Sequence, residues 1–108
     1  MSGFDEREKA QENKSAHEAE LLFKATARRN RMLGEWVAEE FLGLSGDARA
    51  EFAKEVVAAD FDRPGDEDVV EFVQAKVQDA GGDLSEARLR HKMDELLAVA
   101  TAQIKEQS

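Results

Sequence analysis

Residues 22–44 read LFKATARRNRMLGEWVAEEFLGL, and this stretch decides the fold class. Its inward-facing positions recur every three or four residues, which is the spacing along one face of an α-helix. These positions are Leu22, Ala25, Arg29, Leu33, Trp36, Val37, Phe41 and Leu44. Because residues 5–33 also contain no Gly or Pro, the pattern predicts a first helix over residues 18–41.

A second helix is predicted after a glycine-containing turn. Gly43 and Gly46 flank the end of the first helix, and Ser45 or Asp47 is placed to cap the second, which runs to Phe61. The residues expected to face inward are Ala48, Phe52, Val56 and Ala59.

Two more helices complete the predicted fold. Arg63-Pro64-Gly65 breaks the chain, and Asp66 is placed to cap a third helix. The third helix carries Val69, Val70, Val73 and Val77, and the fourth carries Leu89, Met93, Leu96, Leu97, Ala100 and Ile104. A glycine pair at 81–82 separates these helices, and Ser85 begins the fourth. We therefore predict an all-α four-helix bundle without internal repeats.

The first twenty residues are too poor in apolar side chains to contribute to this bundle. Of 28 Val, Ile, Leu, Met, Phe and Trp residues in the 108-residue chain, only Met1 and Phe4 precede residue 21. Burying one such side chain stabilises a fold by about 1.5–3 kcal/mol, whereas ordering one residue costs roughly 1.5 kcal/mol. We therefore predict a flexible N-terminal arm of helix-forming residues over 1–20 and a bundle body over 21–108.

Net charge favours a protein partner. The formal charge is −9, with +1 carried by residues 1–31 and −10 by residues 32–108. This balance disfavours nonspecific binding to nucleic acid or anionic membrane. The chain has no Cys, no apolar secretory signal and no run near the ~18 apolar residues of a membrane span. We expect a cytoplasmic protein without membrane insertion.

No pattern in the sequence indicates catalysis. The glycine loops that bind phosphates and the histidine pairs that bind zinc do not occur, so we predict no enzyme, no cofactor and no metal. His17 and His91 are interpreted as solvated or helix-packed, with a pH sensor as the alternative. The acidic run at 66–68 is explained by the helix dipole, because the rest of a calcium-binding loop is missing.

The densest cationic run is Arg28-Arg29-Asn30-Arg31. On a helix its members spread over three faces, and no aromatic platform for nucleic-acid bases accompanies them. We interpret the run as a solvated surface that pairs with the acidic body. The alternative is that these arginines help to seat the chain on an acidic protein partner.

Four segments, taken in order, carry a family resemblance: MSGFDEREK at 1–9, FKATARRN at 23–30, KEVVAADF at 54–61 with PGDEDV at 64–69, and RHKMDELL at 90–97. They resemble the zeta-type inhibitor subunit of alphaproteobacterial F-type ATP synthases over essentially the whole length. The resemblance implies a bundle that docks on the catalytic head and inserts its arm between a catalytic and a non-catalytic subunit. There it would oppose rotation of the central shaft in the hydrolytic direction.

The resemblance also implies which arm residues bind the partner. The inhibitory segment falls on residues 2–19, and its matching positions are Phe4, Asp5, Arg7, Glu8, Lys9, Glu12, Asn13 and Lys14. Gln11 and Ser15 are polar where many members carry a bulky aromatic side chain. Each lost anchor removes on the order of 1.5–3 kcal/mol, and tenfold in affinity is ~1.4 kcal/mol, so weakened inhibition is expected. The free protein is expected to be a monomer that reaches the inner membrane only through the synthase.

Two alternatives remain open from the sequence. The chain is a scaffold that stays bound to the synthase without inhibiting it, or it is a sensor that binds an adenine nucleotide weakly. In the second alternative, Arg88, Arg90 or Lys92 would contact phosphate.

Overall fold

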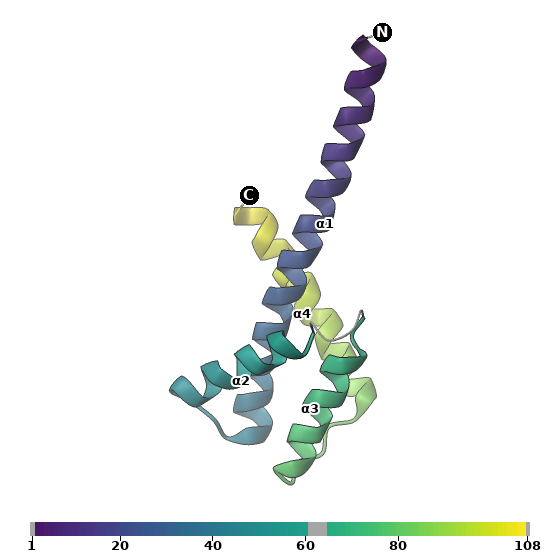
Figure 1. The fold of residues 1–108 in the computed structure, drawn as a ribbon. Helices are drawn as coiled ribbons and strands as arrows, with labels where there is room; N and C mark the ends of the chain where they lie inside the picture. Colours follow the sequence, from purple (N-terminus) through teal and green to yellow (C-terminus); the bar gives the residue numbers. More distant parts are fainter. Residues whose placement is uncertain (1, 61–64, 108) are drawn as a thin grey trace.

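The described part of the chain is helical from end to end apart from short connections. The structure is a computed structural model that describes residues 2–60 and 65–107, with side chains from residue 17 onward. Its elements are α1 (Ser2–Val37), a π-helix η1 (Ala38–Leu42), α2 (Gly46–Ala59), α3 (Glu67–Asp79) and α4 (Glu86–Gln107) (Figure 1). The described residues contain four α-helices and no strand, which confirms the predicted fold class.

The first helix is longer at its start and shorter at its end than the predicted range of 18–41. It begins at Ser2, and after Val37 its last turn widens into η1. Gly43 ends the π-helix with a left-handed φ of 65°, and the Leu44 amide donates to the Ala38 carbonyl at 2.9 Å. Phe41 therefore lies in a π-helical turn, which the apolar spacing did not predict.

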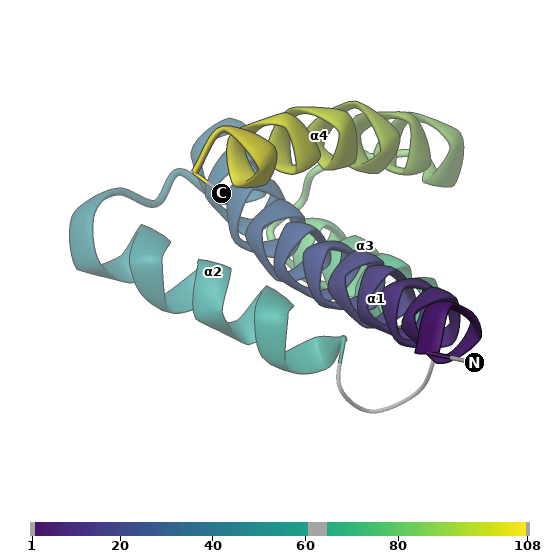
Figure 2. The same cartoon turned by 90° about the horizontal axis from the view of Figure 1, so that it is seen from above.

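The C-terminal half of α1 runs between α2 and α4, with which it makes most of its contacts (Figure 2). The core forms where this half meets the other three helices. Its buried members include Leu33, Val37, Phe52, Val56, Val69, Val70, Val73, Val77, Leu89 and Met93. All four valines predicted to line the third helix are buried, so α3 presents the expected face to the core.

Two residues expected to face inward do not. Leu22 is 60% exposed, because it lies on the part of α1 that extends past the core. Ala48 is exposed in the first turn of α2. The caps also differ from expectation, since neither Ser45 nor Asp66 makes a side-chain cap hydrogen bond among the described residues. The Ser85 hydroxyl does cap α4, accepting from the Arg88 amide at 3.1 Å.

A glycine allows α1 and α2 to cross closely. A Cβ atom at Gly34 would lie 2.6 Å from the Ala53 Cα, a backbone atom that cannot move without shifting α2. The same Cβ would lie 3.2 Å from Val56 Cγ2. Gly34 therefore sets the distance between these two helices.

We expect Gly34→Ala to destabilise the protein by about 1–3 kcal/mol, because the added methyl group forces the helices apart. Helix propensity alone predicts the opposite sign, since Ala is favoured over Gly by about 1 kcal/mol inside a helix. Urea unfolding followed by circular dichroism measures the change. A stabilised variant would show that the crossing tolerates a side chain here.

Candidate functional site

The N-terminal part of α1 projects beyond the bundle (Figure 1). A helix of 36 residues is about 54 Å long, and the whole molecule measures 65 × 25 × 21 Å. The first side chains that the structure describes on the projecting part, residues 17–20, are all exposed. At this height α1 therefore lies free of its own bundle.

The side chains predicted to bind the partner fall on the projecting helix but lie outside the described residues. They are Phe4, Asp5, Arg7, Glu8, Lys9, Glu12, Asn13 and Lys14. Their backbone is helical and continuous with the buried part of α1. The flexibility of the arm and the role of each side chain remain predictions.

A buried ion pair ties α1 to the start of α3 just below this projection. Arg29 is only 2% exposed. Its Nη1 and Nη2 donate to Asp66 Oδ2 at 3.2 Å and Oδ1 at 2.8 Å, and its Nε donates to Asn30 Oδ1 at 3.0 Å. The Arg29 hydrogen bond lowers the pKa of Asp66 below its ordinary 3.8, although burial opposes this shift.

The pair gives a prediction about stability and pH. In Asp66→Asn the buried guanidinium loses its counter-charge, and we expect a loss of about 1–3 kcal/mol at pH 7. This range lies below that of fully buried pairs because the Asp66 side chain is 43% exposed. A depressed carboxyl pKa stabilises the fold above the unfolded pKa and ceases to do so as pH falls through the folded pKa. The difference between wild type and variant should therefore shrink below about pH 4.

The control is Glu67→Gln, which removes the same charge at the neighbouring residue. Glu67 pairs with Arg90 at the surface and is 68% exposed, so its loss should cost at most about 1 kcal/mol. Urea unfolding across pH compares the variants. Equal effects at positions 66 and 67 would contradict a special role for the buried pair.

The structure divides the cationic run at 28–31 among different surroundings. Arg28 donates to the α4 amides Gln103 Oε1 at 3.3 Å and Gln107 Oε1 at 3.1 Å, whereas Arg31 pairs at the surface with Glu35 at 3.3 Å. The spread over three faces is confirmed. The interpretation as a solvated surface is wrong for Arg29, which is buried because its carboxylate partner stands at the edge of the core.

The residues proposed for weak nucleotide binding separate into two groups. The Arg88 guanidinium lies 5.7 Å from the Trp36 ring centroid, and the Lys92 ammonium lies 5.2 Å from it. Both residues line a surface hollow with Trp36 and His91. Arg90 instead donates to Glu86 and Glu67 at 2.9 and 2.6 Å, and these hydrogen bonds raise its pKa. Arg88 and Lys92 therefore share one hollow, in which Lys92 also pairs with Glu95 at 3.6 Å, and Arg90 lies outside it.

The described residues hold neither a group of three metal-ligating side chains nor a helix that could span a membrane. Within residues 17–60 and 65–107, no three His, Asp or Glu side chains are grouped closely enough to hold a metal ion. His91 lies exposed on α4, and His17 is exposed on the projecting helix. Among the helices that the structure describes, none is long and apolar enough to cross a membrane.

Sequence reasoning missed a groove between α1 and α2 of about 550 Å³. Arg31 and the carboxylate Glu35 line it from α1, and Arg49 and Lys54 line it from α2 together with the apolar residues Ala50, Ala53 and Val57. The cations are far apart in sequence, and only the helix crossing at Gly34 brings them together. The cationic run at 28–31 indicated the α1 part of this surface, because it contains Arg31. Arg49 and Lys54 on α2 belong to no such run, so the sequence did not indicate them.

These features define a class: a small helical protein whose first helix packs in the core along one part and continues beyond the bundle along the other. The family model for ATPase inhibitor subunit zeta matches residues 1–103, and the chain belongs to this family. A protein solved by solution NMR is 45% identical, with a TM-score of 0.69 over 80% of this chain and 96% of that chain. A comparison with curated proteins gave no match.

Proposed function

We propose that this protein inhibits ATP hydrolysis by the F-type ATP synthase, acting as a regulatory subunit rather than an enzyme. Membership of the ATPase inhibitor subunit zeta family is the observation that carries the proposal, and the match includes the whole arm. The projecting helix supports it, because a helix with exposed sides has a surface to offer a partner's groove. Through this association the protein would sit at the inner membrane on the cytoplasmic side.

The proposed mechanism places residues 2–19 between a catalytic and a non-catalytic subunit of the head. Phe4 would anchor the helix, and Asp5, Arg7, Glu8, Lys9 and Lys14 would pair with charged groups, with Glu12 and Asn13 completing the contacts. The inserted rod would obstruct rotation of the central shaft in the hydrolytic direction. In this proposal residues 1–20 act as the inhibitory unit and residues 21–108 as the unit that holds it.

The described packing explains how the body could resist the moving shaft. Force on an inserted arm would pass along α1 into its buried half, where Leu33 and Val37 are fully buried and Arg29 is tied to α3. A continuous helix transmits a push without a hinge between arm and body. The body therefore opposes displacement of the arm more strongly than a loose tether would.

The test is helix continuity in the arm at a position that is not a proposed contact. Gln11→Pro should abolish most inhibition, because proline inside a helix costs about 3 kcal/mol and kinks it. Gln11→Ala keeps the helix and should inhibit like wild type. The measurement is ATP hydrolysis by purified cognate synthase titrated with each full-length variant, with circular dichroism to check that the body is folded.

Equal inhibition by the Pro and Ala variants would overturn the inserted helix. Absence of inhibition by wild-type protein that still co-purifies with the synthase would favour the scaffold alternative. Weak nucleotide binding through Arg88 and Lys92 remains a separate prediction, which amide chemical shifts during an ATP titration would test.

A further inference from the structure

We propose that the groove between α1 and α2 is a second docking surface, which receives a carboxylate-bearing segment of the synthase head. The inference rests on the proposed function, because it names the bundle face that meets the same partner as the arm. The groove is lined by three cations, Arg31, Arg49 and Lys54, which we call the rim, by the carboxylate Glu35, and by an apolar set that we call the floor, Ala50, Ala53 and Val57.

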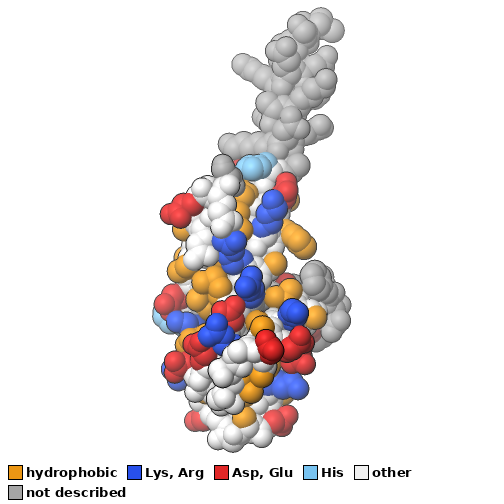
Figure 3. Space-filling view, turned by 90° about the vertical axis from the view of Figure 1, so that its left-hand side faces the viewer, with side chains coloured by type: hydrophobic (Ala, Val, Ile, Leu, Met, Phe, Trp, Pro, Cys, Tyr) orange, Lys and Arg blue, Asp and Glu red, His pale blue; other side chains and the backbone are white. Residues whose placement is uncertain are grey.

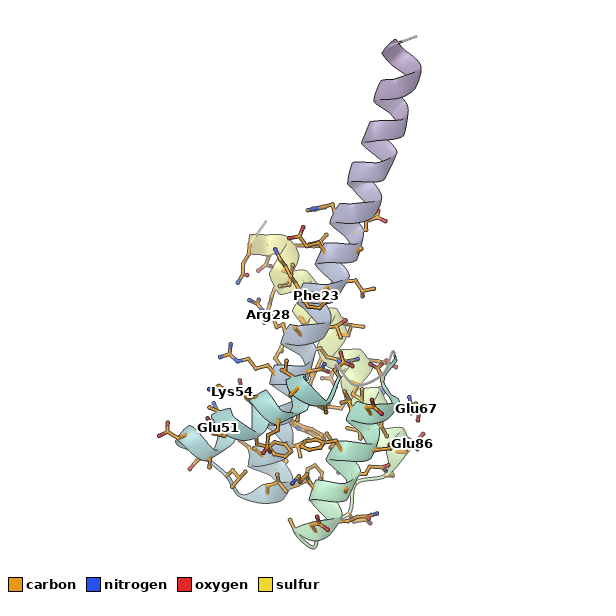
Figure 4. The ribbon with its side chains drawn as sticks, in the orientation of Figure 1. Phe23, Arg28, Glu51, Lys54, Glu67 and Glu86 are labelled. Atoms are coloured by element: carbon orange, nitrogen blue, oxygen red, sulfur yellow. The ribbon has the colours of Figure 1, made fainter. Side chains whose placement is uncertain are left out.

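Charge is the first observation that supports this surface. The chain from residue 32 onward carries a net charge of −10, yet three cations from two helices converge on one groove. Arg28 is not part of the groove, because its guanidinium turns to α4 and donates to the side-chain amides of Gln103 and Gln107. Lys and Arg side chains lie down this face in Figure 3, interspersed with Asp and Glu, and Lys54 and Glu51 are labelled on that side in Figure 4.

The rim cations all pair with carboxylates of their own chain. Arg31 pairs with Glu35 at 3.3 Å, Arg49 with Glu35 at 3.7 Å and also with Glu39, and Lys54 with Glu51 at 3.6 Å. Exposed pairs of this kind contribute little to stability and are screened by salt. A partner's carboxylates can therefore replace them without unfolding the bundle.

The floor and the upper end of the groove supply apolar contact. Val57 lines the groove and also a smaller hollow that Phe23 and Ala27 share with the polar residues Thr26, Asn30 and Asp60, so apolar contact extends from the floor to Phe23. Phe23 is 63% exposed at the point where α1 leaves the bundle. An exposed aromatic beside a cationic rim is typical of the composition of protein interfaces.

Continuity with the arm decides which partner occupies the groove. Arm and groove share one unbroken helix, and Glu20 and Arg31 are about 17 Å apart along its axis. A subunit that encloses the arm is therefore next to the groove without any rearrangement of the bundle. The occupant we propose is an acidic helix or loop of that subunit.

The test neutralises two rim cations in the full-length protein. Arg31→Gln with Lys54→Gln should raise the half-inhibitory concentration at low salt about tenfold and leave maximal inhibition unchanged. Both side chains are about three-quarters exposed, so the fold should be retained. The matched control, Lys76→Gln with Lys105→Gln, removes the same charge at two exposed lysines outside the groove lining.

The salt dependence provides a second readout. Inhibition by wild type should weaken as salt rises, and this dependence should be smaller for the rim variant than for the control. Phe23→Ala should also raise the half-inhibitory concentration without changing the salt dependence. These two signatures separate the charged rim from the apolar end.

The outcomes distinguish this inference from the proposed function. If wild type inhibits and the rim variant matches the control, the groove is not a docking surface although the inhibitory function stands. If wild type does not inhibit, the proposed function fails, and cosedimentation with the synthase then compares binding of the same variants. A wild-type dimer in sedimentation that the rim substitutions dissociate would assign the groove to a second copy of the chain and overturn the inference.

Discussion

The structure depends on one constraint: α1 must pack as a core helix along its C-terminal half and project beyond the bundle along its N-terminal half. The buried half is held between α2 and α4 by Leu33 and Val37, and Gly34 lets α2 approach within contact of the α1 backbone. These contacts fix the direction in which the rest of α1 projects. The position of the arm is therefore a consequence of how the core is packed.

The Arg29–Asp66 pair lies within the buried half of α1, one turn after Ala25. A guanidinium at this depth requires hydrogen-bonding partners, because an unpaired buried charge destabilises a fold. Asp66 and Asn30 provide them, and Asp66 lies next to the start of α3. The pair therefore links the helix that carries the arm to the helix that closes the core.

The sequence predicted the parts of this arrangement that depend on local patterning. The valines of α3 and the cap at Ser85 follow from spacing and from residue type, and both are found as expected. The apolar stripe placed Arg29 on the inward face, but its carboxylate partner lies 37 residues away and no local pattern identifies it. Ala48 was misplaced because helical spacing does not tell where α2 first reaches α1.

The candidate site, too, was predicted only in part from the sequence. The resemblance to the family indicated the arm, whereas the basic groove arises only from the crossing of two helices and was not predictable from either helix alone. We propose the same partner for both surfaces. The body holds α1 in place, and the synthase head supplies the binding contacts.

Amide hydrogen exchange along residues 2–20, compared between the free protein and its complex with purified synthase, tests that account most directly. We expect fast exchange in the free protein, because the helix projects beyond the bundle and residues 17–20 are exposed, and strong protection in the complex. Strong protection already in the free protein, or fast exchange within an inhibited complex, would contradict it.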